Sequence, residues 1–279
     1  MDHLRPSFFI IGVNKCGTSS LYRYLMAHPN VLPCALKEPN FFGLHSAEYI
    51  ASHMDEYWAL FPTREYQGDL SFRWEASDQA GTPSLTMVHI KRDPAKSYIT
   101  GEASANTFHD VSPSLLHQYL PDTRLILLVR NPIDRAYSNH QMYQRFQSGG
   151  NQLGFDVKDF ETDICAELEA HARGEKTHYI SPGIYIDKLQ KWVSQYGWGQ
   201  MRVIITEELA YPGKAKRIMR KLEDYLEVSR HDYGDILSRR FNHALPSDIA
   251  PRLRALLADF YQTYNRGLQE YLGHELQWE

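Results

Sequence analysis

The sequence has 279 residues, of which 43% are hydrophobic and 23% are charged, and its formal net charge is -4 at pH 7. This composition is ordinary for a globular chain that buries a sizeable core, and the slightly negative balance argues against general nucleic-acid binding. Any anion site must therefore be built from local basic residues. No Pro/Ser/Gly-rich linker, low-complexity tract or internal repeat divides the chain, so we expect a single α/β domain over residues 1–279.

The cysteines and the start of the chain bear on its cellular location. Cys16, Cys34 and Cys165 are odd in number and widely spaced, without a CxxC pair or a neighbouring His, and so predict neither a disulfide framework nor a zinc site. The first apolar segment begins at Phe8 without a basic and apolar leader, and no later stretch is long enough to span a bilayer. We expect a cytoplasmic protein with no membrane partner, although a removed signal or anchor would leave the same appearance.

The first informative stretch is residues 8–25, which predict a strand, a loop and a helix. Four apolar residues before Gly12 indicate a buried parallel strand, and apolar residues at helical spacing follow Thr18. The loop contains Gly12 and Gly17, whose backbone freedom lets successive N–H groups converge. We expect Thr18 or Ser19 to cap the helix, whose positive end then faces an anion. The sequence therefore predicts a phosphate-binding loop.

This loop differs from the P-loop of nucleotide triphosphatases. That motif, GxxxxGK[ST], needs a lysine directly after its second glycine. Gly12 and Gly17 have the required separation, but Thr18 follows the second glycine and the lysine, Lys15, lies between the two. An ordinary glycine-containing turn between a strand and a helix remains the alternative for the loop taken alone.

A short segment, residues 37–42, places a carboxylate before a proline and an aromatic pair. Pro39 disfavours helical backbone at Glu38, and the two phenylalanines are expected to pack beneath the turn. This arrangement could hold Glu38 at the mouth of the phosphate-binding loop, and a solvated Lys-Glu turn is the alternative. Residues 47–61 then predict an amphipathic helix.

Two polar segments are expected to be insertions that bind an acceptor molecule. Residues 62–96 are irregular and rich in Arg, Lys and Trp, which predicts a surface insertion. Residues 139–180 are also polar, contain an expected helix at about Phe160 to Ala172, and could form a lid. Between these insertions, residues 98–104 predict a strand that runs into a loop with a second carboxylate, Glu102.

The second informative stretch is residues 124–138. Five consecutive apolar residues predict a buried strand, Arg130 stands at its C-terminal end, and Pro132 is well placed as the first helical residue. Because ligands of open parallel sheets bind outside the carboxyl ends of the strands, we expect Arg130 at the same edge as the first loop. Ser138 follows two turns into the helix, so a guanidinium and a hydroxyl could hold one phosphate.

The remainder of the chain predicts further core elements and one basic loop. A helix opened by Pro182, a strand at 201–206, and helices at about 214–226 and 249–272 carry apolar residues at the spacing of buried faces. Between the last two helices, residues 238–243 form a basic loop that could close over a bound anion. A solvated basic turn is the alternative there.

These stretches, in this order, resemble the sulfotransferases that use 3′-phosphoadenosine 5′-phosphosulfate (PAPS). The resemblance is greatest to the carbohydrate branch, which includes the heparan sulfate enzymes and bacterial relatives, and it covers nearly the whole chain. It implies a P-loop-like α/β fold, with a central parallel sheet flanked by helices. It also implies that PAPS is held by Asn14, Lys15, Cys16, Gly17, Thr18, Ser19, Ser20, Arg130 and Ser138. Arg239 and Arg240 of the basic loop are further candidates for binding this ligand.

The same resemblance implies a reaction, in-line transfer of a sulfuryl group to a hydroxyl or amine of a glycan or small molecule. Lys15 would stabilise the leaving oxygen, and a carboxylate would take the proton of the acceptor. Glu38 is the first candidate for this base and Glu102 the second. Several carbohydrate sulfotransferases carry a lysine where this chain has Ala103, so the charge of that lysine must come from elsewhere. No metal is expected.

Other candidates remain open at the level of the sequence. His45 and His109 are reserve candidates for the base, although each is more typical of a surface or satisfied core histidine. An ATP-dependent phosphotransferase that requires magnesium is the rival enzyme. A non-catalytic module that binds nucleotides or polyanions is the rival from another class. The oligomeric state and the identity of the acceptor are not predicted.

Overall fold

The chain forms two compact units in a computed structural model. The first unit comprises Met1–Val129 and Val193–His243, and the second comprises Arg130–Trp192 and Ala244–Glu279. Each unit is therefore built from two separate stretches of chain. The single domain expected from the sequence stays a prediction. The structure describes residues 2–64, 69–77, 83–91, 93, 96–150, 154–239 and 248–278.

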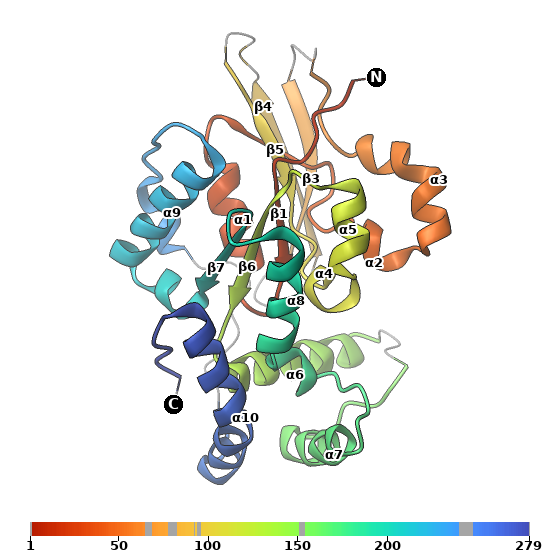
Figure 1. Ribbon diagram of the computed structural model, residues 1–279, viewed down its shortest axis with the longest axis vertical. Helices are drawn as coiled ribbons and strands as arrows, with labels where there is room; N and C mark the ends of the chain where they lie inside the picture. Colours follow the sequence, from red (N-terminus) through yellow and green to blue (C-terminus); the bar gives the residue numbers. More distant parts are fainter. Residues whose placement is uncertain are drawn as a thin grey trace. The chain divides into compact units, whose positions relative to one another are not determined.

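A five-stranded sheet forms the centre of the first unit (Figure 1). All its neighbouring strand pairs are parallel. β1 (Phe8–Gly12) consists of four apolar residues and a glycine and is buried throughout, and the five apolar residues that follow Arg124 in β6 (Arg124–Val129) are also buried. This is expected for strands covered on both faces. The predicted α/β fold with a central parallel sheet is therefore confirmed. In spatial order the strands are β2 (Val31–Pro33), β5 (Ile99–Glu102), β1 (Phe8–Gly12), β6 (Arg124–Val129) and β7 (Met201–Ile205).

Helices of the first unit follow most of these strands, as the apolar spacing predicts. Side chains cap two of them: Ser46 Oγ accepts a hydrogen bond from Tyr49 N at 3.3 Å, and Ser112 Oγ accepts one from Leu115 N at 3.2 Å. The helices and single 3-10 turns are α1 (Thr18–Met26), α2 (Phe41–Leu44), α3 (Ala47–Trp58), α4 (Thr107–Asp110), α5 (Pro113–Tyr119), η2 (Thr206–Ala210), α9 (Pro212–Leu226) and η3 (Gly234–Ser238).

The expectation of an irregular segment at residues 62–96 is wrong. This segment contains two long strands, β3 (Asp69–Ser77) and β4 (Pro83–Lys91), which pair antiparallel over their whole length with Phe72 opposite Val88. Apolar and polar residues alternate throughout β3, and in β4 the alternation is interrupted where Met87 and Val88 are adjacent. The overall polarity of the segment conceals this period of two. Arg64, just before the hairpin, forms an ion pair with Asp2 at 3.2 Å.

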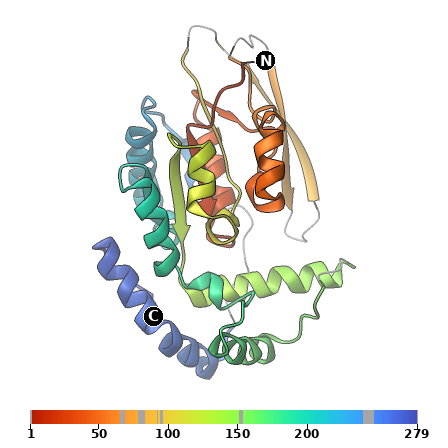
Figure 2. The same ribbon diagram turned by 45° about the vertical axis from the view of Figure 1, so that its right-hand side comes forward.

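The second unit is helical in the part that the structure describes. Ile133 and Ala136 of α6 pack with Ile164 of α7 in one buried cluster that also includes Leu257 and Tyr261 of α10. Figure 2 shows α7 lying beside the long helix α6. The elements are α6 (Pro132–Ser148), α7 (Phe160–Ala172), η1 (Ser181–Gly183), α8 (Ile186–Tyr196), whose last turn belongs to the first unit, and α10 (Pro251–Leu272).

Two boundaries in this unit differ from the prediction. The helix expected from Pro182 is a single 3-10 turn, and α8 begins only at Ile186. The helix is interrupted at Ile184, whose backbone is extended with a φ of -90° and a ψ of 94°. Packing is also close at Gly183, where an added Cβ would lie 2.7 Å from the Tyr261 hydroxyl and 2.8 Å from Pro132 Cβ. In addition, α6 continues to Ser148, so part of the predicted insertion at 139–180 is helix.

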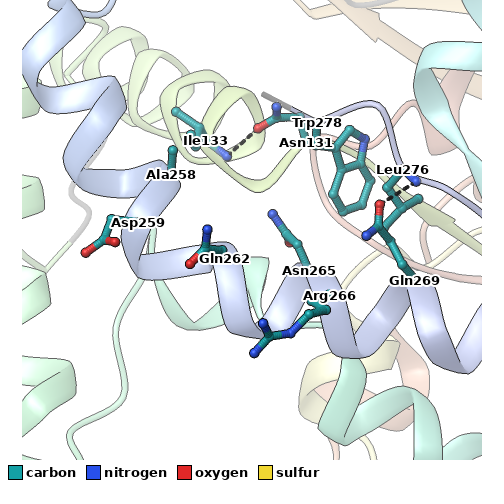
Figure 3. Close-up of a pocket in the computed structure, with 10 residues that line it drawn as sticks. All are labelled: Asn131, Ile133, Ala258, Asp259, Gln262, Asn265, Arg266, Gln269, Leu276 and Trp278. Carbon is teal, nitrogen blue, oxygen red and sulfur yellow. Dashed lines mark hydrogen bonds between the residues drawn. The ribbon is translucent and has the colours of Figure 1, made fainter.

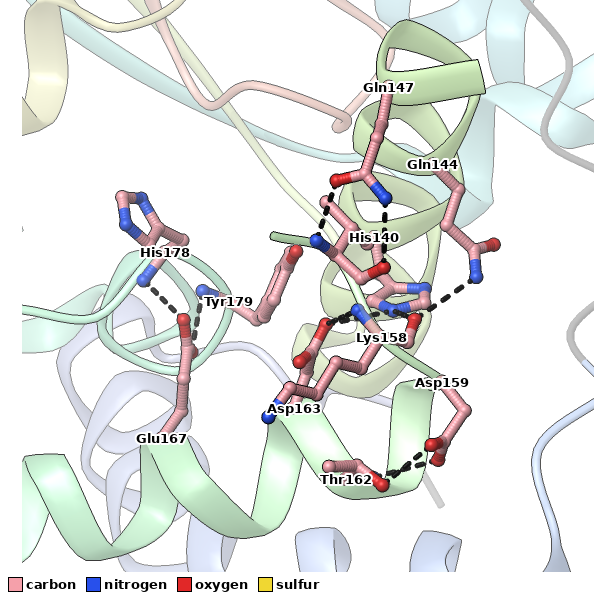
Figure 4. Close-up of polar contacts among 11 residues, drawn as sticks. His140, Gln144, Gln147, Lys158, Asp159, Thr162, Asp163, Glu167, His178 and Tyr179 are labelled. Carbon is pink, nitrogen blue, oxygen red and sulfur yellow. Dashed lines mark hydrogen bonds and ion pairs between the residues drawn. The ribbon is translucent and has the colours of Figure 1, made fainter. Parts of the chain in front are cut away.

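A polar network ties α7 to its neighbours within the second unit (Figure 4). The Nε2 atom of His140 lies 3.2 Å from Asp163 Oδ2 and 3.1 Å from the carbonyl oxygen of Lys158. The carboxylate of Glu167 accepts hydrogen bonds from three consecutive backbone N–H groups, at residues 178–180, with distances of 2.6, 2.7 and 2.9 Å. These bonds anchor α7 to the segment that follows it. A lid function for residues 139–180 stays a prediction.

Candidate functional site

Hydrogen bonds fix the conformation of the loop between β1 and α1, which lies beside β6. Val13 N donates to Leu128 O at 3.0 Å, and Thr206 Oγ1 donates to Cys16 O at 2.6 Å. Gly12 allows a close approach, because an added Cβ would lie 2.9 Å from Phe108 Cβ and 3.0 Å from the Ala105 carbonyl oxygen. The expected loop between the first strand and the first helix is therefore present.

Two residues of this loop adopt left-handed backbone conformations. Lys15 has a φ of 70° and Gly17 a φ of 86°. Such residues turn successive N–H groups toward one side of a loop, which is the geometry of an anion nest. The loop leads directly into the N-terminus of α1, whose first N–H groups have no partner within the helix. The combination favours an anionic ligand.

The capping expected from Thr18 or Ser19 is wrong. The cap residue of α1 is Gly17, and no side chain caps the helix. Because Gly17 is left-handed, Thr18 is already the first residue of α1. Of the implied donor-binding residues in the loop, Asn14, Lys15, Gly17 and Ser19 are partly exposed, while Cys16, Thr18 and Ser20 are buried. Cys16 is fully buried, and its main-chain N–H and carbonyl oxygen are bonded to Val13 O and Thr206 Oγ1.

Glu38 lies in a turn that is tied to the end of β5. Ala103 N donates to Lys37 O at 3.2 Å, and Asn40 N donates to Ser104 Oγ at 2.9 Å. The carboxylate of Glu38 is paired with the ammonium group of Lys37, and the two side chains are 34% and 11% exposed. The alternative of a freely solvated Lys-Glu turn does not describe this arrangement, because Lys37 is largely buried and the turn is bonded to a neighbouring segment.

Glu102, the second candidate for the base, is fully buried at the end of β5. Tyr57 donates its hydroxyl to Glu102 Oε1 at 2.7 Å, and Ser104 donates its hydroxyl to Oε2. Burial raises the pKa of the Glu102 carboxyl to about 7, against the hydrogen bonds from Ser104 and Tyr57, which lower it. A carboxylate enclosed in this way has no exposed oxygen to offer an acceptor.

Sequence reasoning missed Tyr57 and Ser104. Tyr57 was expected only as part of the apolar face of a helix, and Ser104 only as a residue of the loop after a strand. They lie 45 and 2 positions from Glu102 in the chain. A buried carboxylate needs hydrogen-bond donors, but nothing in the sequence shows that Glu102 is buried. The histidines held in reserve lie elsewhere: His45 is exposed and stacks on Tyr49 at 4.2 Å, and His109 lies in α4.

The predicted phosphate-binding residues of the second motif belong to the second unit. Arg130 directly follows β6 and is partly exposed, and its carbonyl oxygen accepts the hydroxyl of Tyr185 at 2.9 Å. Asn131 caps α6, since its Oδ1 accepts a hydrogen bond from Ile133 N at 2.9 Å, and Pro132 is the first helical residue as expected. Ser138 lies in the same helix and is 2% exposed.

The other arginine of this motif has a structural position. Arg135 is 1% exposed and donates to the carbonyl oxygen of Tyr179. It therefore holds the segment before η1 against α6. Of the two arginines, Arg130 is the one with an exposed part. Arg239 is exposed and its carbonyl oxygen accepts the hydroxyl of Tyr24 at 2.8 Å, whereas Arg240 lies outside the described residues.

A surface pocket of about 540 Å³ opens next to Asn131 in the second unit (Figure 3). Gln262 and Asn265 project from α10 on the side where Asn131 and Trp278 lie. Gln269 is held in place because its Oε1 accepts a hydrogen bond from Leu276 N at 2.7 Å. The lining residues are Asn131, Ile133, Ala258, Asp259, Gln262, Asn265, Arg266, Gln269, Leu276 and Trp278.

Several kinds of feature are absent from the described residues. They contain no group of three or more His, Cys, Asp or Glu side chains that could hold a metal ion. The three cysteines, all within the described ranges, form no disulfide. In the same part of the chain, no helix combines the length and the apolar character needed to cross a bilayer.

The chain belongs to the sulfotransferase family, whose model matches residues 6–182. It is 24% identical to human carbohydrate sulfotransferase 15, over 97% of this chain and 54% of that protein. It is 25% identical to mouse heparan sulfate glucosamine 3-O-sulfotransferase 3A1, over 98% of this chain and 64% of that protein. The chain thus spans only about half to two thirds of the length of these curated relatives.

Solved structures agree on the fold. A sulfotransferase from Alicyclobacillus acidocaldarius superposes with a TM-score of 0.66 at 23% identity, covering 98% of this chain and 97% of that one. Mouse sulfotransferase SULT7A1, complexed with PAP, gives a TM-score of 0.52 at 13% identity, covering 98% and 90%. The predicted family and its α/β fold are both confirmed.

Proposed function

We propose that this protein transfers a sulfuryl group from PAPS to a hydroxyl or amine of a glycan or small-molecule acceptor. Membership of the sulfotransferase family supports the reaction class. The observation that carries the proposal is the conformation of the loop before α1. Lys15 and Gly17 have left-handed backbone there, and Lys15 is partly exposed. A loop of this kind suits the doubly charged phosphosulfate end of the donor.

In this proposal the first unit binds the phosphosulfate. The main-chain N–H groups at the start of α1 and the ammonium group of Lys15 would hold its oxygens. As sulfuryl transfer proceeds, negative charge grows on the oxygen that leaves with the nucleotide. A fixed cation and fixed backbone dipoles aimed at that oxygen stabilise the transition state more than the ground state. The residues present therefore fit the donor.

Glu38 is the proposed general base. Its carboxylate is 34% exposed, whereas Glu102 is fully buried and already accepts two hydrogen bonds. Lys37 pairs with Glu38, which places a cation beside the proposed base. The main chain of Lys37 also accepts a hydrogen bond from Ala103 N, so this lysine is the proposed substitute for the cation that some relatives carry at the position of Ala103.

Arg130 and Ser138 are the proposed ligands of the 3′-phosphate, as the second motif of the sequence implies. A guanidinium can bind a phosphate through two parallel hydrogen bonds, and a serine hydroxyl can add a third. The carbonyl oxygen of Arg130 accepts the hydroxyl of Tyr185, which fixes its main chain, and the residue is partly exposed. Arg239 is proposed as a further residue that contacts PAPS, because it is exposed. Arg240 stays a prediction from the sequence.

The pocket beside α10 supports a polar acceptor rich in hydroxyl groups. Amide side chains such as Gln262 and Asn265 can donate and accept hydrogen bonds with hydroxyls. Trp278 offers a large flat surface, and its ring also lies 6.1 Å from that of Tyr185. Sugars present both hydroxyls and flat apolar faces, so this lining favours a glycan over a purely apolar acceptor.

Calorimetric titration tests the donor class. We expect adenosine 3′,5′-bisphosphate (PAP) to bind tightly without metal, and ATP with magnesium to bind weakly. Transfer of labelled sulfate from PAPS to a panel of glycans and small molecules would then identify the acceptor. Preference for magnesium-ATP would point to a phosphotransferase, and binding of PAP without transfer to any acceptor would point to a nucleotide-binding module.

A further inference from the structure

The turn that carries Glu38 is bonded on both sides to the segment after β5. One residue before Glu38, the carbonyl oxygen of Lys37 accepts Ala103 N at 3.2 Å. Two residues after it, Asn40 N donates to Ser104 Oγ at 2.9 Å. Pro39 further restricts the backbone of Glu38. The main chain around Glu38 therefore depends on the position of the Ser104 hydroxyl.

The Ser104 hydroxyl is in turn fixed by Glu102. A serine hydroxyl has one proton to donate and lone pairs to accept. Because its oxygen accepts the Asn40 N–H, its proton goes to Glu102 Oε2. The other oxygen of Glu102 accepts the hydroxyl of Tyr57 at 2.7 Å. Ser104 is 1% exposed and Glu102 is fully buried, so water does not compete for these bonds.

We infer that Glu102 is a positioning residue, which orients the Ser104 hydroxyl so that Ser104 holds Asn40 and thereby fixes the turn that presents Glu38. This inference rests on the proposed function, since it assigns Glu102 a role in the same reaction. Glu102 does not touch the acceptor. It acts on Glu38 through two successive hydrogen bonds, from Ser104 to Glu102 and from Asn40 to Ser104. A general base that is displaced by a small distance loses much of its catalytic effect.

Replacement of Ser104 by Ala removes both bonds of this chain. We expect kcat for sulfate transfer to fall by up to about 10²-fold in Ser104→Ala, while the KM for the acceptor and the Kd for PAP stay unchanged. Ser104→Thr keeps the hydroxyl and should restore most of the activity. Thr123→Val is the matched control: Thr123 is also a buried hydroxyl of the first unit, and it donates to Pro6 O at 2.8 Å.

A double-variant cycle separates positioning from a general loss of structure. If Ser104 acts through Glu38, Ser104→Ala should lower kcat no further in a protein that already carries Glu38→Gln. Losses that multiply in the double variant would overturn the inference, because they would show that Ser104 acts independently of Glu38.

Amide hydrogen exchange tests the geometry without any assay of turnover. The Asn40 amide should exchange faster in Ser104→Ala and in Glu102→Gln than in the wild type or in Thr123→Val. Unchanged exchange at Asn40 would overturn the inference whatever the activity. Faster exchange in a protein that neither binds PAP nor transfers sulfate would uphold the contacts and overturn the proposed function.

Discussion

Tyr57 Oη and Glu102 Oε1 lie 2.7 Å apart, and both side chains are fully buried in the first unit. Tyr57 belongs to α3 and Glu102 to the end of β5, so this bond joins a helix to a central strand of the sheet. Phe41 and Phe42 pack on Tyr57 with ring centroids 5.2 and 5.0 Å away. The partner of the carboxylate is thus packed among aromatic rings, and burial of the carboxylate itself raises its pKa.

Stability should fall as pH rises through the range in which Glu102 ionises. Burial raises the pKa of Glu102 from 4.5 to about 7. The folded form therefore keeps its proton over a range where the unfolded chain loses it, and the stabilisation present below pH 4.5 is lost by about pH 7. This group alone should lower the free energy of unfolding by up to roughly 3 kcal/mol. Urea unfolding at pH 5 and pH 8 measures the difference.

Glu102→Gln should remove this pH dependence, since the amide does not titrate. Glu161→Gln, at an exposed position of α7, is the control and should retain it. An equal slope of stability with pH in wild type and Glu102→Gln would show that another group titrates in this range.

Lys15→Ala should remove most turnover. The lysine is proposed to stabilise charge that develops on the leaving oxygen, and the loss of one such group typically costs about 10²–10³-fold in kcat. Transfer of labelled sulfate under saturating donor measures the loss. Lys216→Ala, at an exposed position of α9, provides the comparison. Full activity in Lys15→Ala would exclude the assigned role.

Arg130→Ala should reduce the preference for a nucleotide with a 3′-phosphate. The ratio of the Kd of adenosine 5′-monophosphate to that of PAP is expected to fall roughly tenfold or more, because a charged hydrogen-bond pair is lost. Calorimetry with both ligands gives the ratio. Arg173→Ala is the control: it removes an exposed arginine that pairs with Glu175 at 2.6 Å, and it should leave the ratio of the two Kd values unchanged. A uniform loss of affinity for both nucleotides would argue against contact with the 3′-phosphate.

Trp278→Ala should weaken the acceptor and spare the donor. Ring stacking is typically worth about 0.5–1.5 kcal/mol, so we expect the KM for a glycan acceptor to rise severalfold at constant Kd for PAP. Trp198→Ala, which removes an indole that is 43% exposed in the first unit, is the matched control. An unchanged KM would remove the pocket beside α10 from the acceptor site.

Much of the fold could be predicted because its central strands are short apolar runs. β1, β6 and β7 lie at the segments where the sequence predicts strands, and residues 160–172 form the expected helix. The hairpin of β3 and β4 was missed because its alternating pattern averages to a polar composition.

The candidate site could be predicted only as far as its motifs. The loop around Lys15 and the end of β6 before Arg130 lie where the sequence places them. The burial of Glu102 could not be predicted, since its partner Tyr57 belongs to α3, a helix distant from it in the sequence. The cap of α1 could not be predicted either. Gly17 takes this position with left-handed backbone, and Thr18 is already the first helical residue.

The interleaving of the two units has a consequence for synthesis on the ribosome. Strands β2, β5, β1 and β6 are complete once residue 129 has emerged, but β7, which pairs with β6, follows only at Met201–Ile205. Until then the growing chain presents β6 as an unprotected sheet edge, a surface prone to pairing with other chains. The second unit is likewise incomplete until α10 (Pro251–Leu272) has been synthesised. The first unit is completed only after β7 has been made and the second only after α10, so chaperone protection during translation should improve the yield of folded protein.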